Sequence, residues 1–98
     1  MNLQSTERDD VIAIVIEGDI EMTTMKGLKE ELLTIAREKE KDLVIDFEKV
    51  LYLDSSGIGV LIAISKILKE KGKSLRLINL TGAISRVLEL SSLADMIE

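Results

Sequence analysis

The chain has no histidine and no cysteine among its 98 residues. Without histidine it lacks the usual general base, the commonest metal ligand and any Ser-His-Asp triad. Without cysteine it has no disulfide bonds and no thiolate ligands for a metal, which fits a reducing compartment. A nucleophilic serine would need a lysine or carboxylate as its base, and no spacing nominates one. We therefore predict a protein that is not an enzyme and binds no metal.

Aromatic residues are nearly absent as well, at 2% of the chain, and the formal net charge is −5. Readers of single-stranded nucleic acid stack bases on aromatic rings, and nucleic-acid binders carry a basic surface, so no nucleic-acid partner is expected. No apolar run approaches the roughly 20 residues of a membrane span, and the first ten residues lack the pattern of a signal peptide. These features predict a cytoplasmic protein that does not bind membranes.

Hydrophobic residues make up 46% of the sequence, enough for one self-sufficient domain over residues 1–98. The patterning predicts an edge strand at residues 2–8 and a strand at 11–16 that is apolar at every position, as in a central strand covered on both faces. In the strands predicted at 43–47 and 74–78, one face is more apolar than the other, which indicates that helices cover mainly one side of the sheet.

Helical spacing of apolar residues predicts three helices between and after these strands, at residues 24–39, 58–68 and 81–90. Thr23 or Thr24 is the expected N-cap of the first helix and Thr81 that of the last, in which Ile84, Val87 and Leu88 are predicted to face inward. The order of elements calls for right-handed crossovers. It predicts an α/β fold, with a mostly parallel four-stranded sheet, an N-terminal edge strand and three to four helices.

The sequence YLDSSGIG at residues 52–59 lies between a predicted strand and a predicted helix. The first backbone N–H groups of a helix lack internal partners and stabilise a phosphoryl group, so Ser55 is a candidate phosphorylation site. Ser55 could equally cap the helix, and the two roles are compatible. Asp54 is a weaker candidate as an aspartyl-phosphate acceptor, and Gly57 and Gly59 are expected to serve close packing at the start of the helix.

Sites in parallel sheets gather beyond the carboxyl ends of the strands, where the loops at residues 18–24 and 49–57 are expected to adjoin. We expect a partner to contact polar and loop residues there, namely Asp19, Glu21, Thr23, Asp54, Ser55, Ser56, Gly57 and Ile58.

At YLDSSGIG the chain resembles the bacterial anti-sigma factor antagonists, the small single-domain members of the STAS family (sulfate transporter and anti-sigma factor antagonist). The resemblance covers nearly the whole chain. Besides residues 54–57 and Gly59, it includes the Gly18-Asp19-Ile20 turn, the sequence VIDF at residues 44–47 and the sequence ISRVL at residues 84–88. It implies a STAS-like single domain over residues 1–98.

The resemblance further implies partner switching. The unphosphorylated antagonist binds an anti-sigma factor that is also a serine kinase and so frees the sigma factor. Phosphorylation of the serine after the loop aspartate, here Ser55, breaks that complex, and a phosphoserine phosphatase resets it. ATP belongs to the kinase, so no cofactor is expected, and the chain is expected to be a monomer or weak dimer. The alternative is a STAS scaffold or regulatory subunit in a lipid-transport ATPase or a stress-signalling assembly.

Overall fold

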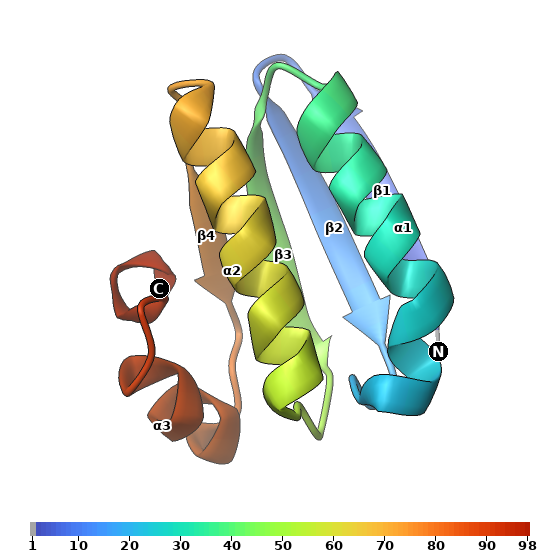
Figure 1. Ribbon diagram of the computed structural model, residues 1–98, viewed down its shortest axis with the longest axis vertical. Coiled ribbons are helices and arrows are strands. Elements are labelled where there is room, and N and C mark those ends of the chain that lie inside the picture. Colours follow the sequence, from blue (N-terminus) through green and yellow to red (C-terminus); the bar gives the residue numbers. More distant parts are fainter. Residues whose placement is uncertain (1) are drawn as a thin grey trace.

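A four-stranded sheet in the order β1-β2-β3-β4 carries two helices on one face in the computed structural model, which describes residues 2–98 (Figure 1). Strand β1 pairs antiparallel with β2, whereas β2, β3 and β4 are parallel. The predicted fold, a mostly parallel α/β sheet with an N-terminal edge strand, is therefore confirmed. The elements are β1 (Asn2–Arg8), β2 (Val11–Glu17), α1 (Met22–Glu38), β3 (Asp42–Lys49), α2 (Ser55–Glu70), β4 (Leu75–Ile78), α3 (Gly82–Glu89) and the 3-10 helix η1 (Ala94–Met96).

The sheet is covered on one face only. In β2 the side chains of Ile12, Ile14 and Ile16 are buried, while Ala13 between them is exposed. Both right-handed crossovers, through α1 and through α2, place their helix on the same side of the sheet (Figure 1). The prediction that residues 11–16 are covered on both faces is thus wrong, and the one-sided cover predicted from the later strands is confirmed.

The two long helices begin earlier than the sequence pattern predicted. Glu21, not a threonine, is the N-cap of α1, and Thr24 contributes by accepting the Glu21 N–H at 3.1 Å. Helix α2 begins at Ser55, three residues before the predicted start at Ile58. The earlier start places the two serines of the loop inside the first turn of a 16-residue helix.

Helix α3 lies beyond the end of β4 and closes one side of the core. Thr81 caps it, as predicted, with its hydroxyl oxygen accepting the Ile84 N–H at 3.4 Å. Ile84 and Leu88 are one turn apart and buried, but Val87 is 45% exposed and lines an open groove with Leu51 and Tyr52. The prediction that Val87 faces inward is therefore wrong. Along residues 2–98 no helix combines the length and apolar character needed to cross a bilayer.

Candidate functional site

Asp54 joins the N-termini of the two long helices. It is the N-cap of α2, and its Oδ1 accepts hydrogen bonds from the backbone N–H groups of Ser56 (3.0 Å) and Gly57 (3.1 Å). The same oxygen accepts the Ser56 hydroxyl at 2.5 Å, while Oδ2 accepts the Met22 N–H of α1 at 3.1 Å. A single carboxylate thus satisfies otherwise unpaired donors at the start of both helices.

These donors decide the chemistry open to Asp54. The hydrogen bond from the Ser56 hydroxyl, supported by the backbone N–H groups of Gly57, Met22 and Ser56, lowers the pKa of the Asp54 carboxyl below its ordinary value of 3.8, while partial burial opposes the shift. Asp54 is therefore ionised at neutral pH and is a poor proton acceptor. With its oxygens already bonded, this side chain suits a structural role better than that of an aspartyl-phosphate acceptor.

The two serines after Asp54 have different surroundings. Ser55 is the first residue of α2 and is exposed, and its hydroxyl makes no hydrogen bond to any other residue in the described part of the chain. Ser56 is half-buried, and its hydroxyl donates to Asp54. The hypothesis that Ser55 caps the helix is wrong, because Asp54 occupies that position. Of the two serines in the first turn of α2, Ser55 is the one with the accessible hydroxyl.

The two loops predicted to adjoin do so. The Ile20 N–H donates to the Tyr52 carbonyl at 2.8 Å, and the Asp54 N–H donates to the Ile20 carbonyl at 3.0 Å, so the loops pair like short parallel strands. Beside this pairing Asp19 is exposed, and the Thr23 hydroxyl donates to the half-buried Glu21 side chain. The carboxyl end of the sheet therefore carries one continuous polar surface around Ser55.

Gly57 lies directly beneath this surface. A Cβ atom there would stand 2.4 Å from Leu53 Cδ1 and 2.7 Å from Ile20 Cγ2, both in buried side chains, so the predicted close packing is confirmed for Gly57. It is wrong for Gly59, where a Cβ would meet nothing within 4 Å. Because Gly57 is buried, it supports the surface without offering atoms to a partner, whereas Ile58 is half-buried at its edge.

Several apolar residues at the same end of the sheet were missed by the sequence analysis. Met22 is 76% exposed beside Asp54, and Leu51 and Tyr52, just before the loop aspartate, are 77% and 53% exposed. An apolar pair in a connection between strand and helix was the available signal. Within residues 2–98 no group of three or more histidine, cysteine or acidic residues is placed to hold a metal ion.

Fold and site together define a small α/β domain that presents a serine on an open surface at a helix N-terminus. The family profile of the STAS domain matches residues 2–98. The chain belongs to the STAS domain family.

This chain aligns with similar known proteins over nearly the whole length of both chains. The anti-sigma-B factor antagonist of Bacillus subtilis (strain 168) is 33% identical over 98 residues, which cover 100% of this chain and 89% of that protein. Among solved structures, the anti-sigma factor antagonist SpoIIAA in its unphosphorylated form superposes with a TM-score of 0.86 at 17% identity, covering 99% of this chain and 86% of that one. The Bacillus cell fate determinant SpoIIAA in the phosphorylated form gives a TM-score of 0.80 at 17% identity, with coverage of 99% and 89%. The two superpositions show a shared fold.

Proposed function

We propose that this chain is an anti-sigma factor antagonist that acts by partner switching and is phosphorylated on Ser55. In the unphosphorylated state it binds an anti-sigma factor with serine kinase activity, which releases the sigma factor for transcription. The kinase, using its own ATP, then phosphorylates Ser55 and frees itself, and a phosphoserine phosphatase restores the starting state. The chain itself has no catalytic role, requires no cofactor and acts in the cytoplasm, where sigma factors meet RNA polymerase.

One observation carries the choice of Ser55: its hydroxyl is exposed and unbonded within residues 2–98, whereas the neighbouring Ser56 hydroxyl is held by Asp54. A kinase needs a hydroxyl that it can reach and deprotonate. The names of the relatives support the role, since an anti-sigma-B factor antagonist is 33% identical to this chain over 98 aligned residues. The phosphorylated form known for SpoIIAA supports the modification.

Phosphorylation should break the interface and leave the fold intact. A phosphoserine adds a charge of about −1.5 to −2, and its place in the first turn of α2 lets the helix dipole stabilise that charge within the same molecule. The modified residue lies on the outer surface. The phosphate therefore takes space that a bound partner would fill, and it holds water that the partner would have to displace. We place the partner on the exposed and half-buried residues of this surface and leave buried Gly57 out: Asp19, Glu21, Thr23, Asp54, Ser55, Ser56 and Ile58.

Peptide mass mapping after incubation with the cognate anti-sigma factor kinase and ATP tests the proposal. The phosphate should be found on Ser55, should be absent from Ser55→Ala and should stay on Ser55 in Ser56→Ala. Ser55→Ala should bind the kinase like the wild type, and Ser55→Asp should bind at least tenfold more weakly, a difference of about 1.4 kcal/mol. Its Tm should stay within roughly 3 °C of the wild type, because an acidic side chain suits the first turn of a helix.

Phosphate on Asp54 or Ser56, or no phosphate at all, contradicts the assignment. A large loss of thermal stability in Ser55→Asp would show that the residue is structural. Stable copurification with a transport ATPase, whatever the state of Ser55, would favour a scaffold role in its place.

A further inference from the structure

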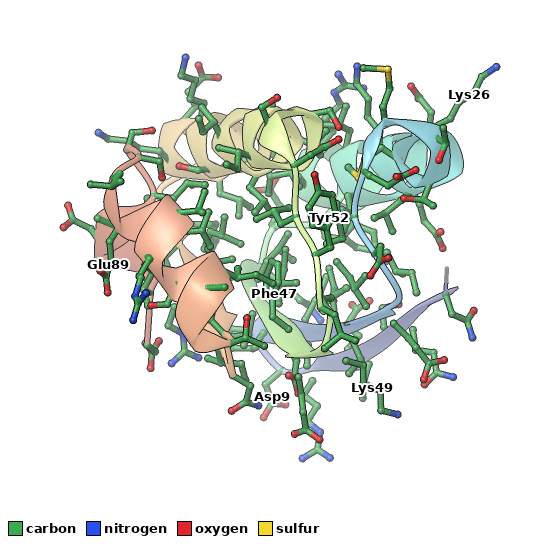
Figure 2. The ribbon with its side chains drawn as sticks, turned by 90° about the horizontal axis from the view of Figure 1, so that it is seen from below. Asp9, Lys26, Phe47, Lys49, Tyr52 and Glu89 are labelled. Carbon is green, nitrogen blue, oxygen red and sulfur yellow. The ribbon has the colours of Figure 1, made fainter. Side chains whose placement is uncertain are left out.

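Exposed apolar side chains gather at the end of the molecule that carries Ser55. Residues 2–98 expose five large hydrophobic side chains, and three of them, Leu51, Tyr52 and Val87, line a single groove. The groove has a volume of about 170 Å³, and its remaining walls are Leu53, Ala83 and Ile84. Figure 2 looks onto this end and shows Tyr52 near its centre, between the first turn of α1 and α3, which carries Glu89.

The apolar side chains of Leu51, Tyr52 and Val87 are not part of the buried core. Ile84 and Leu88 already provide the buried face of α3, and Val87 lies outside the core cluster of buried residues at 45% exposure. Tyr52 contributes its backbone carbonyl to the loop pairing, while its ring remains 53% exposed. Apolar residues that cluster on a surface without a packing role are characteristic of interaction sites.

The groove is continuous with the surface around Ser55. Tyr52 and Leu53 line the groove and are followed directly in the sequence by Asp54 and Ser55, and Leu53 forms a parallel bridge with Ile20 of the neighbouring loop. A partner that covers the Ser55 hydroxyl must therefore lie across or beside the groove. Because the groove and the surface around Ser55 are continuous, we assign both to the same partner.

We propose that the anti-sigma factor kinase anchors itself by inserting one large apolar side chain into this groove while it covers Ser55. The inference rests on the proposed function and specifies how the partner is held. An apolar cavity of about 150 Å³ accommodates a benzene molecule, so a groove of about 170 Å³ fits one aromatic or branched aliphatic side chain. Burial of such a side chain supplies affinity that the polar loop alone does not.

Matched substitutions on α3 test the anchor. Val87 lines the groove, whereas Leu90, the residue that follows the helix, is 92% exposed and lies outside the lining. Val87→Gln should raise the Kd for the purified anti-sigma factor kinase by roughly tenfold or more. The same change in Leu90→Gln should alter the Kd by less than about twofold. Both proteins should retain the wild-type circular dichroism spectrum, because both side chains are exposed.

A second variant fills the groove from the same helix, one turn before Val87. Ala83 is exposed on the first turn of α3, so Ala83→Gln adds a side chain over the groove without entering the core. It should weaken kinase binding by a similar factor and raise the KM for phosphorylation of Ser55. This variant keeps the test decisive if Val87→Gln folds poorly.

Equal binding of the kinase by the wild type, Val87→Gln and Ala83→Gln would overturn the anchor while leaving the proposed function standing. A change confined to self-association in analytical ultracentrifugation, with kinase binding unaltered, would assign the groove to a second copy of the chain and also overturn it. Failure of the wild type to bind any kinase-type anti-sigma factor would overturn the proposed function and the anchor together.

Discussion

Gly57 and Gly59 stand two residues apart in α2 but face different surroundings. The Cβ position of Gly57 is occupied by Leu53 and Ile20, whereas that of Gly59 is open to solvent. Leu53 and Ile20 are buried and form the bridge between the two loops of the site, so neither can move away freely. At Gly57, a hydrogen in place of a side chain therefore allows the first turn of α2 to lie against the loops.

Paired alanine substitutions should separate these two roles. Gly59→Ala should stabilise the protein by about 0.5–1 kcal/mol, because alanine is the better helix former. Gly57→Ala should have a free energy of unfolding lower than that of Gly59→Ala by about 1–3 kcal/mol, the cost of overpacking. Urea unfolding followed by circular dichroism measures both values. Equal free energies for the two variants would show that the contact at Gly57 relaxes without cost.

At the scale of the elements, helices α1 and α2 run side by side and charged groups join them at both ends (Figure 1). Asp54 accepts donors from both N-termini. At the other end Lys71 Nζ donates to the backbone carbonyl oxygens of Arg37 and, at 3.3 Å, Lys39. A negative group at the N-termini and a positive one at the C-termini both complement the helix dipoles. The pair of helices that supports the site is thus fastened at each end.

The stabilisation that the Asp54 carboxylate gives to the N-termini of α1 and α2 should decrease in acid. The folded-state pKa of Asp54 lies below its ordinary value of 3.8, so its stabilising contribution is present above that pH and is lost as the pH falls through the folded-state pKa. Asp54→Asn can still cap the helix but cannot ionise. The difference in free energy of unfolding between the wild type and Asp54→Asn should therefore shrink between pH 7 and about pH 3.

Urea titrations of both proteins at each pH give this difference directly. Glu7, whose pKa is lowered by Lys41 and then Lys39, titrates in both proteins and cancels from the comparison. A difference that stays constant over the whole pH range would mean that the charge of Asp54 contributes nothing.

The sequence predicted which elements exist better than it predicted where they begin. Apolar periodicity located the helix at 58–68, but the first turn of α2 is polar and gives no periodic signal, so its true start at Ser55 was missed. For the same reason Ser55, and not Asp54, was considered as the cap of this helix. The topology alone predicted that the loops at residues 18–24 and 49–57 adjoin at the carboxyl end of the sheet, and this prediction is confirmed.

At the scale of the whole molecule, the remaining errors concern how the elements pack against one another. An apolar strand at 11–16 is compatible with cover on both faces, and only the common hand of the two crossovers decides against it. Val87 matches an inward position by spacing. It is exposed all the same, because α3 is only eight residues long and buries only Ile84 and Leu88. Exposed apolar groups of this kind depend on tertiary packing, which periodicity does not report.

The charge distribution over the molecule bears on how phosphorylation would release the partner. The chain carries a net charge of −5, and Asp19 and Glu21 lie in the loop that pairs with the loop of Asp54, next to Ser55 in the sequence. A partner that complements this surface is basic, so simple attraction would favour the phosphorylated form. Release must then come mainly from the space taken by the phosphate and from the cost of removing its water next to an apolar groove, since burying an unpaired charge is expensive.

This mechanism predicts that release is insensitive to salt. Raising the ionic strength from 0.1 M to 1 M shortens the screening length from about 10 Å to about 3 Å. The Kd of each form should rise, because salt screens the attraction to the basic partner. The ratio of the Kd of the phosphorylated protein to that of the unphosphorylated protein should change by less than about threefold. Isothermal titration calorimetry of both forms at the two ionic strengths measures the ratio, with Ser55→Ala as the control for salt effects that do not involve the phosphate. A ratio that collapses toward one at high salt would instead identify charge repulsion as the cause of release, because only a screened interaction is lost in that way.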